Sequence, residues 1–296
     1  MQKTKLTSEK IAPFLVLLAA ITFSIGGVLV KLVSWSPLSI NAARSLIAAI
    51  EIFIYMKLRH HKLVINKSVL IGGTAMAACS ILWTIANKLT SAANAILLEY
   101  TAPIFIIFLM WAIFREKPDK TDIVATIVMI FGVVLFFVDS ISLDNLIGNV
   151  FGLGAGVTYA LVFMMKKFKG SDTLSSVLIG CILSSLIGLP WLIQETDYSG
   201  MNILGLLLIG ILQFGFSYIC MAEGLVNTPP LMASLISMVE PILNPILAAI
   251  ILKEILGTLS LIGAAIVIGG VAVYNIVKEK NSKASLSKAG AESSIK

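Results

Sequence analysis

The segment PIFIIFLMWAIFRE at residues 103–116 returns in altered form as PILNPILAAIILKE at residues 241–254. Both segments begin with proline, continue with apolar residues and end with a basic residue followed by glutamate, at the same spacing. Gly132 and Gly270 repeat at the same separation. The chain is therefore expected to consist of two related halves.

The composition is that of an integral membrane protein. Of the 296 residues, 58% are hydrophobic and only 13% are charged, whereas a soluble domain carries about 25% charged residues. A membrane-spanning helix needs about 20 predominantly apolar residues. The stretches that meet this length predict an all-α integral membrane protein with ten transmembrane helices, at 11–33, 38–57, 68–87, 93–114, 121–139, 148–168, 174–194, 202–222, 230–252 and 257–277.

The repeat divides these ten helices into two five-helix repeats, residues 11–140 and 145–277. Because each repeat has an odd number of helices, the second repeat must lie inverted in the membrane. Inverted repeats are typical of secondary transporters that work by alternating access. Residues 1–10 are predicted to be a cytoplasmic N-terminus, and the polar residues 278–296 a disordered cytoplasmic tail.

The links between the ten predicted helices lie alternately on the two sides of the membrane, and the basic residues are distributed unequally between these two sides. If the N-terminus is cytoplasmic, most of the 22 Lys and Arg residues fall on cytoplasmic links, and the outer links 139–149 and 195–201 carry none. The positive-inside rule then predicts a multi-pass protein of the cytoplasmic (inner) membrane with both termini cytoplasmic. The net charge of +6 needs no nucleic-acid partner, because basic links face anionic lipid.

Four segments carry a resemblance to a known family: SAANAILLEYTAPIFIIFLMWAIFREKP (91–118), VEPILNPILAAIILKEILGTLSLIGAAIVIGGV (239–271), KLVSWSPLSINAARSLIAAI (31–50) and GVTYALVFMMKK (156–167). They resemble the helix signatures of EamA-type transporters in the drug/metabolite transporter superfamily. The resemblance extends over nearly the whole chain. It implies a central cavity between the two halves, lined by the first, third, fourth, sixth, eighth and ninth helices, and a small metabolite as substrate.

The chain departs from the family pattern at two positions. Phe23 stands where tryptophan is frequent, and Glu99 stands where a neutral residue is more usual. Glu99 and Glu240 are acids inside predicted spans, where an ionisable group costs at least about 2.5–3.5 kcal/mol and usually faces a cavity or a partner. We predict that both bind substrate or exchange protons. The alternative is that they are structural acids, bonded to a neighbouring helix or close to the membrane interface.

Prolines accompany both acids. Pro103 follows Glu99 by one turn, and Pro241 and Pro245 follow Glu240. Proline removes a backbone donor and kinks a helix, and interrupted helices at mid-membrane mark binding sites in transporters. We therefore predict helix kinks at these three prolines, with packing alone as the alternative.

Further polar and aromatic residues complete the predicted site, because small-molecule sites combine aromatic walls with a few polar groups. Asn244 shares a helix face with Glu240. The other candidates are Tyr100, Trp83, Asn87, Tyr159 and Gln213. Arg44 is expected to pair with another group such as Glu51 or to snorkel, although it could attract a carboxylate. Tyr218 is a weaker candidate for the cavity wall, and the alternative is that it anchors a membrane interface.

Other chemistries find little support. The three cysteines are isolated, and no Cys/His spacing suggests a metal site. GLGAG at 152–156 follows no strand, so we interpret it as close helix packing rather than nucleotide binding. No Walker motif is present. We therefore expect no cofactor, no metal and no enzymatic activity.

The expected function is that of a secondary active transporter, more specifically an exporter. Its substrates are expected to be small metabolites such as amino acids or related amines and carboxylates, with protons as the candidate coupling ion and a monomer as the candidate unit. Loss of water favours the neutral form of a carboxylate, which makes Glu99 and Glu240 the candidates for proton exchange. The alternatives are a membrane channel or a non-transporting membrane sensor.

Overall fold

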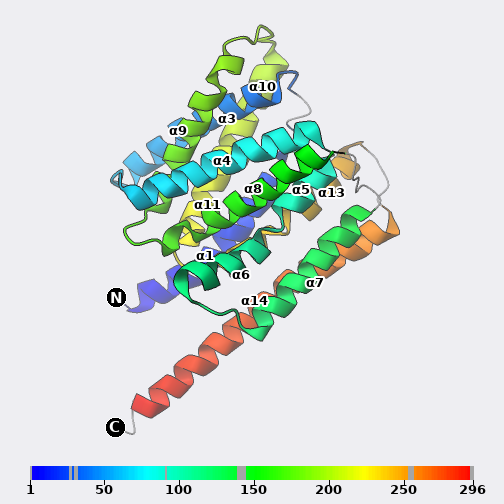
Figure 1. Cartoon of the computed structure of the whole chain (residues 1–296). Coiled ribbons are helices and arrows are strands. Elements are labelled where there is room, and N and C mark those ends of the chain that lie inside the picture. The colour runs from blue at the N-terminus through cyan, green and yellow to red at the C-terminus, as the bar shows by residue number, and fades with distance from the viewer. Residues whose placement is uncertain are drawn as a thin grey trace.

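The computed structural model describes residues 2–26, 29, 33–90, 92–138, 145–252 and 257–293; for 2–10, 87–88, 92–94, 245, 248–249, 251–252 and 282–293 it describes the backbone alone. Every regular element in these ranges is helical (Figure 1). The elements are α1 Gln2–Phe23, α3 Pro37–Leu58, α4 Lys67–Leu89, α5 Ala92–Glu99, α6 Ala102–Phe114, α7 Lys120–Phe137, α8 Leu146–Met164, a 3₁₀ turn Met165–Lys167, α9 Thr173–Leu192, α10 Gly200–Leu208, a π-helical segment Ile209–Phe216, α11 Ser217–Leu225, α12 Pro230–Ser237, α13 Glu240–Leu252 and α14 Thr258–Ser293.

The helices have the length and composition of membrane spans. Eight apolar stretches in the described ranges are long enough to cross a bilayer, and two shorter apolar helices, Ile11–Phe23 and Pro230–Asn244, lie in the first and ninth predicted spans. The prediction of an all-α membrane protein is confirmed, while the count of ten stays a prediction.

Polar residues in the links determine where the helices begin. Each of five helices starts at a residue whose side-chain oxygen accepts a hydrogen bond from the backbone amide three residues on, which satisfies a free donor of the first turn. These caps are Ser36, Asn66, Asp119, Asn145 and Asp172.

Two of the predicted spans are interrupted, at equivalent places in the two halves. The fourth breaks between Glu99 and Ala102, which separates α5 from α6, and the ninth breaks between Ser237 and Glu240, which separates α12 from α13. Pro103 lies in the first turn of α6, where a missing amide donor is tolerated, and Pro241 follows the first residue of α13. Pro245 lies within α13, and its side chain falls outside the described residues.

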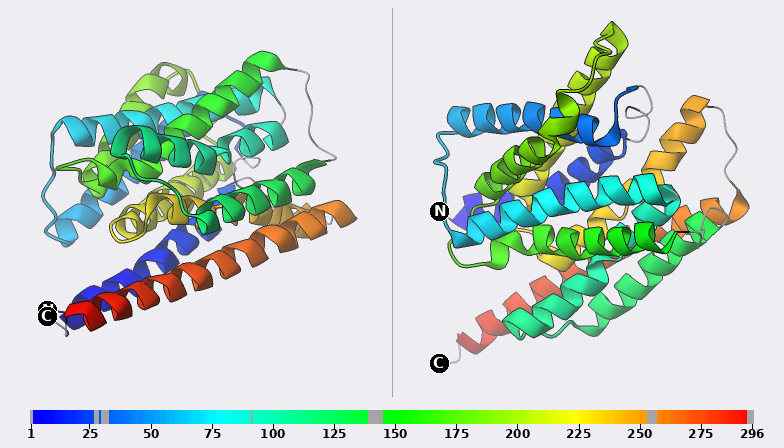
Figure 2. Two further views of the ribbon diagram at one scale, coloured as in Figure 1. Left: turned by 60° about the horizontal axis from the view of Figure 1, so that its bottom comes forward. Right: turned by 45° about the horizontal axis from the view of Figure 1, so that its top comes forward.

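Helix pairs recur as the repeat requires. Helix α4, in the third span of the first repeat, packs along α8, in the first span of the second repeat. The equivalent pair with the repeats exchanged, α11 and α1, also packs together. Helix α3 packs along α9, so the second helix of one half meets the second helix of the other. Helices α7 and α14 form a pair beside this bundle, and Figure 2 shows them running side by side in both views.

Hydrogen bonds tie the two halves together at one end of the molecule. The indole Nε1 of Trp35 donates to the backbone oxygen of Asp197 at 2.7 Å, and the amide of Ser36 donates to Glu195 Oε1 at 2.9 Å. These links join the loop before α3 to the loop after α9.

The C-terminal end differs from the predicted disordered tail at 278–296, because α14 continues as a helix through Ser293. The segment after Val277 is rich in Lys, Glu and Ala, which are good helix formers. Extending an existing helix also avoids the unfavourable nucleation step.

Candidate functional site

A small cavity lies where the two interrupted spans meet the bundle. It measures about 60 Å³, well below the roughly 300–1,000 Å³ of typical small-molecule sites. Its walls come from both halves of the chain. They are Phe23, Arg44, Cys79, Ser80, Trp83, Glu99, Tyr159, Gln213, Phe214, Tyr218 and Glu240.

The two acids enter this cavity from the helix breaks. Glu99 is the last residue of α5, and Glu240 is the first residue of α13. The hydroxyl of Tyr100 donates to Glu240 Oε2 at 2.6 Å, so a residue of the first half holds the acid of the second half. The thiol of Cys79 lies 3.6 Å from Glu99 Oε1 and can donate to it.

Arg44 supplies a positive charge to the same cavity and is only 6% exposed. Its Nη2 and Nε donate to Asn41 Oδ1 at 2.9 and 3.2 Å, and Nη2 also donates to Ser80 Oγ at 3.3 Å. Its guanidinium carbon lies 4.4 Å from the ring centroid of Phe214. Arg44 therefore pairs with other groups inside the bundle, as one of the expectations had it, but these groups are the neutral acceptors Asn41 and Ser80 and not Glu51.

Aromatic rings form much of the remaining wall. The ring of Tyr218 packs edge-to-face against Phe23 and Phe214, with centroids 4.9 and 4.7 Å apart. Tyr218 is 7% exposed and lines the cavity, so of its two alternatives the structure agrees with the cavity wall and not with the interface anchor. Tyr159 packs against Tyr100 in the same geometry, with centroids 6.0 Å apart.

Gln213 lies in the π-helical segment of the eighth span, and such segments often occur at functional sites. Its amide oxygen is buried, and no hydrogen-bond donor reaches it from the described part of the chain. It is therefore available to accept a hydrogen bond from a molecule in the cavity.

The structure brings together most, not all, of the predicted site residues. Five of the predicted residues line the cavity, namely Glu99, Glu240, Trp83, Tyr159 and Gln213. Tyr100 reaches it through its bond to Glu240. Asn244 does not line it, and the side chain of Asn87 lies outside the described residues.

Sequence reasoning missed three of the polar lining residues, namely Arg44 as a site residue, Ser80 and Cys79. One signal was available: Asn41 and Arg44 are one turn apart on a single helix face inside an apolar span. Nothing in the sequence brings Ser80 and Cys79 to that face. Among the described residues, no group of three or more His, Cys, Asp and Glu side chains could hold a metal.

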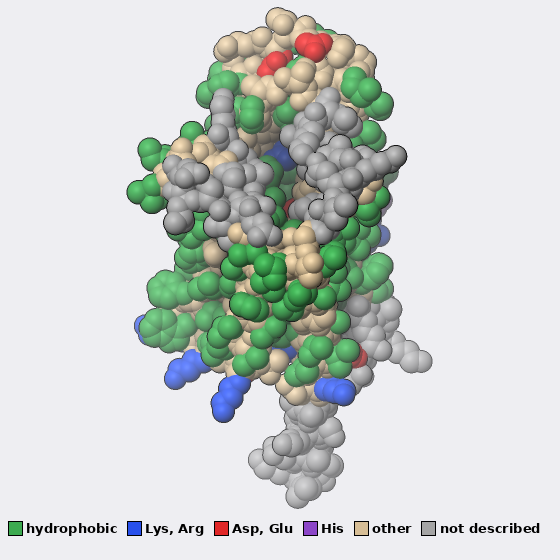
Figure 3. Space-filling view, turned by 90° about the vertical axis from the view of Figure 1, so that its right-hand side faces the viewer, with side chains coloured by type: hydrophobic (Ala, Val, Ile, Leu, Met, Phe, Trp, Pro, Cys, Tyr) green, Lys and Arg blue, Asp and Glu red, His purple; other side chains and the backbone are tan. Residues whose placement is uncertain are grey.

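Charge is distributed unevenly over the outside. Figure 3 shows several Lys and Arg side chains gathered toward one end of the molecule, two acidic side chains at the opposite end, and mainly hydrophobic side chains between them. At the basic end, Lys167 pairs with Glu116 at 2.6 Å, and His61 Nε2 lies 2.9 Å from Asp172 Oδ2. Burial raises the pKa of Asp172, but its bonds from Ser175 and His61 outweigh this and hold the pKa below its usual value.

Comparisons with known proteins agree with this architecture. The profile of the EamA-like transporter family matches residues 10–138 and again residues 146–276. An uncharacterized transporter of Clostridium kluyveri is 31% identical over 65% of this chain, a match that spans just under two thirds (66%) of that protein. The uncharacterized transporter YwfM of Bacillus subtilis is 26% identical, over 85% of this chain and 88% of the relative.

A solved structure, described only as a crystal structure of protein, superimposes with a TM-score of 0.77. It covers 90% of this chain and 98% of its own, at 17% sequence identity. At this identity the likeness concerns the fold alone.

Proposed function

Because the chain belongs to the EamA-like transporter family, we propose that this multi-pass membrane transporter is a secondary active exporter of small zwitterionic metabolites, such as amino acids. The observation that carries the proposal is the lining of one cavity by groups of both charges, the cation Arg44 and the acids Glu99 and Glu240. Both acids lie at helix interruptions, which are the usual places for transporter sites.

The charges define the substrate class. Arginine recognises a carboxylate through charge-assisted hydrogen bonds, and Glu99 or Glu240 can accept bonds from an ammonium group. The rings of Trp83 and Phe214 supply the apolar wall that such sites use to bury a side chain. A molecule with an amine, a carboxylate and a small apolar body fits these groups.

The acids also support proton coupling. A carboxylate that loses water favours its neutral form, so Glu99 and Glu240 can exchange a proton for a cationic substrate. The hydroxyl of Tyr100 donates to Glu240 and so stabilises its charged form when no substrate is bound. Because the substrate and the proton compete for the same acids, the substrate would move in one direction and the proton in the opposite direction.

The small volume supports alternating access. A cavity of about 60 Å³ cannot admit a metabolite, so the lining helices must separate before a substrate enters. The interrupted helices α5–α6 and α12–α13 provide the points at which they can bend. The channel alternative has no specific observation in its favour.

The orientation follows from the two charged ends. The basic end holds Lys167 and Lys278 and faces the cytoplasm under the positive-inside rule. This supports the proposal that the protein lies in the cytoplasmic (inner) membrane with both termini inside. A reporter that is active only outside the cytoplasm, fused after Lys280, should stay inactive, and activity there contradicts the assignment.

Counterflow in proteoliposomes tests the function. The assay screens labelled amino acids and small amines with and without a pH gradient, using the wild type, Glu99→Gln, Glu240→Gln and the control Glu116→Gln. Glu116 is half exposed, pairs with Lys167 and does not line this cavity. Wild type and control should exchange substrate saturably, while both cavity variants lose at least about tenfold in rate.

Two results count against the proposal. If a substrate is found and both cavity variants keep full, equally pH-dependent exchange, the acids are structural. If no tested compound shows counterflow, the channel or sensor alternatives gain weight.

A further inference from the structure

One wall of the charged cavity is built by two elements that pack closely on each other, helix α3 and the π-helical segment Ile209–Phe216. A Cβ atom added at Gly210 would lie 2.7 Å from Ile47 Cβ, and one added at Gly215 would overlap Glu51 Oε2. The two glycines therefore let the segment approach α3 closely. We expect this wall to move as one unit when the cavity opens.

The wall carries two polar groups that line the cavity, the guanidinium of Arg44 from α3 and the amide of Gln213 from the π-helical segment. The guanidinium carbon lies 4.4 Å from the ring centroid of Phe214. Phe214 directly follows Gln213 in the chain and also lines the cavity. The guanidinium and the amide are therefore close enough to contact one small molecule from the same side.

The amide oxygen of Gln213 is buried without a hydrogen-bond donor, and the whole residue is only 7% exposed. The amide of Asn41 on the neighbouring helix shows the usual state. Its oxygen accepts from Arg44 and from Ser80 Oγ, at 2.9 and 2.6 Å. Because buried polar groups in folded proteins are almost always bonded to protein or water, the oxygen of Gln213 is best explained as an acceptor reserved for a ligand.

A glycine opposite Gln213 gives its side chain the space that it occupies. A Cβ atom added at Gly26, shortly after the end of α1, would lie 2.8 Å from Cδ and Nε2 of Gln213 and 2.9 Å from its Cγ. The three atoms nearest to this position all belong to Gln213. A side chain at position 26 would therefore displace the amide of Gln213 from its present place in the wall.

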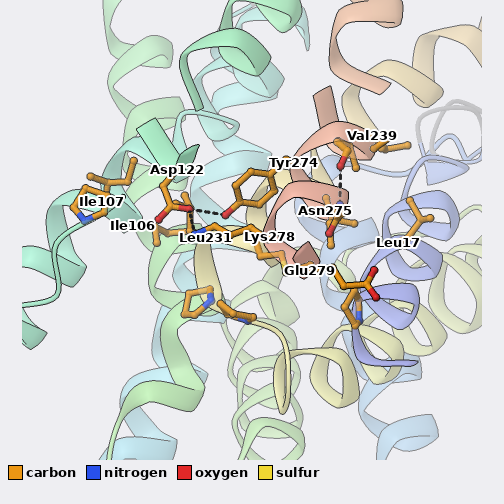
Figure 4. A pocket seen from close by; sticks show the side chains of 18 of the residues that line it. Leu17, Ile106, Ile107, Asp122, Leu231, Val239, Tyr274, Asn275, Lys278 and Glu279 are labelled. Atoms are coloured by element: carbon orange, nitrogen blue, oxygen red, sulfur yellow. Dashed lines mark hydrogen bonds and ion pairs between the residues drawn. The ribbon is translucent and has the colours of Figure 1, made fainter. Parts of the chain in front are cut away.

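A larger cavity, of about 1,290 Å³, lies between α1, α6, α12 and α14 (Figure 4). At its polar end Lys278 Nζ pairs with Asp119 and Asp122 at 2.7 and 2.6 Å. The oxygen of Asn275 also lacks a donor there, but these three charged groups already satisfy one another. The smaller cavity combines the unpartnered oxygen of Gln213 with charges of both signs that form no ion pair within the described residues.

We propose that Gln213 recognises the amino group of the substrate, by accepting a hydrogen bond from one of its N–H groups while Arg44 on the same wall binds the carboxylate. This inference rests on the proposed function and deepens it. It restricts the substrates to amino acids and related zwitterions that keep at least one N–H on the ammonium group. Gln213 determines this specificity, and Gly26 is a positioning residue that acts through Gln213.

Charge alone does not provide this selectivity. Glu99 and Glu240 attract any cation, including a quaternary ammonium, which carries the same charge but has no N–H. A quaternary ammonium would leave the buried oxygen of Gln213 unpaired. A site that is built to hydrogen-bond its substrate discriminates strongly against an analogue that lacks the bond, because the buried polar group of the site then has no partner.

Equilibrium binding to the purified full-length protein tests the proposal. The probes are L-alanine, L-leucine and L-phenylalanine, each compared with its N,N-dimethyl and N,N,N-trimethyl derivatives. The protonated dimethyl compound keeps one N–H and is almost as bulky as the trimethyl compound, so it controls for size. Gln213→Met keeps the length of the side chain and removes the acceptor. Leu212→Met is the matched control, because Leu212 is 46% exposed and does not line the cavity.

The wild type and Leu212→Met should bind the dimethyl compound at least about tenfold more tightly than the trimethyl compound. In Gln213→Met this ratio should fall to within about twofold of one, because neither compound then finds an acceptor. An equal ratio in the wild type and in Gln213→Met overturns the proposal. Failure of every amino acid in the panel to bind the wild type also overturns it.

A double-mutant cycle tests the positioning role of Gly26. Gly26→Ala should lower the same binding ratio about as much as Gln213→Met does. In a Gln213→Ala background, which lacks the three atoms that the new Cβ would meet, Gly26→Ala should change the ratio less than about twofold. An equal effect of Gly26→Ala in both backgrounds would show that it acts on the fold and not through Gln213. If Gln213→Met does not fold, Gly26→Ala tests the specificity.

Counterflow of the same compounds separates this inference from the proposed function. If the wild type shows the binding preference without counterflow, the transport function fails and the role of Gln213 stands. If it exchanges the dimethyl and trimethyl compounds equally well, the transport function stands and the role of Gln213 is wrong.

Discussion

Arg44 is a charged residue held inside a membrane bundle entirely by neutral partners. Asn41 accepts two of its hydrogen bonds, and Asn41 is in turn fixed by a bond from its own amide nitrogen to Ser184 at 2.9 Å. Because no acid forms an ion pair with the guanidinium in the described structure, its charge is available to a ligand. This arrangement suits a residue that must bind and release a carboxylate.

Replacing Arg44 with lysine tests this role. Lysine keeps the charge but loses the fork geometry and the planar packing on Phe214. The apparent affinity for a substrate with a carboxylate should fall about tenfold, or ~1.4 kcal/mol, and that for an amine without a carboxylate should change less. Counterflow titrations with both compounds measure the difference, and Arg59→Lys at the exposed end of α3 is the control. An equal loss for both compounds would assign Arg44 a structural role only.

The acids of the site were predictable and the role of Arg44 was not. Glu99 and Glu240 each interrupt an apolar run next to a proline, so the sequence itself marks them. The partners of Arg44 come from two helices, with Ser80 on α4 and Asn41 on α3. A single sequence does not say which faces of two helices meet, and for the same reason it does not decide whether Tyr218 lies in the cavity wall or at the interface.

At the scale of elements, the break between α5 and α6 packs directly on α8. A Cβ atom added at Gly156 of α8 would lie 2.7 Å from the backbone oxygen of Leu98 and 2.9 Å from Thr101 Oγ1. A Cβ atom added at Gly152 of the same helix would lie 3.0 Å from Leu98 Cβ. The interpretation of GLGAG as a close-packing motif is confirmed by these distances.

Gly156→Ala should therefore destabilise the protein. Overpacking against backbone atoms costs typically about 1–3 kcal/mol, and the midpoint of thermal denaturation in detergent should fall. Gly269→Ala on α14 is the matched control, since a Cβ there meets nothing within 4 Å and alanine favours a helix. A similar midpoint for both variants would mean that α8 can move away from the break.

Asp172 caps α9 and also pairs with His61, so its charge contributes to stability. Its pKa is lowered in the folded state, which means that the stabilisation is present above the ordinary aspartate pKa of about 3.9. It is lost as the pH falls through the lower folded value. Asp172→Asn should thus melt below the wild type at pH 7, and the gap should narrow below about pH 4.

Asp172→Ala separates the cap from the charge. It removes both and should lose about 1 kcal/mol more than Asp172→Asn, the usual contribution of an N-cap. Denaturation midpoints across pH measure both effects. A gap between wild type and Asp172→Asn that stays constant down to pH 3 would contradict the assigned role of the charge.

The sequence predicts where the helices lie more accurately than it predicts whether each helix is continuous. Apolar runs and polar caps such as Asn66 and Asp172 located the spans, because both signals are local. The sequence predicts kinks, whereas the structure shows complete interruptions of the helix at Glu99 and at Glu240. Both parts of each interrupted span are packed on a neighbouring helix, α8 in the first case and α1 in the second. The helical end of α14 differs from the prediction because the polar composition after Val277 is typical of disorder, and composition does not reveal that the preceding helix at 257–277 continues into this segment.

At the scale of the whole molecule, the repeat at 103–116 and 241–254 predicted two halves, and the equivalent helix pairs agree with it. The closed state of the central cavity could not be predicted. In the proposed alternating-access mechanism, this volume would change as the two halves move against each other. Cys79 is suited to test this movement because it lines the cavity and is only 3% exposed.

Thiol labelling can follow the opening directly. In a Cys181→Ser/Cys220→Ser background, N-ethylmaleimide reaches Cys79 only when the halves separate, so labelling should be slow. A saturating substrate occupies the opened cavity and should slow it several-fold further. The control retains Cys181 in place of Cys79, because Cys181 is buried and does not line the cavity. Equal labelling rates at the two positions, unaffected by substrate, would show that Cys79 reacts through general unfolding, and the alternating-access mechanism would lose its structural support.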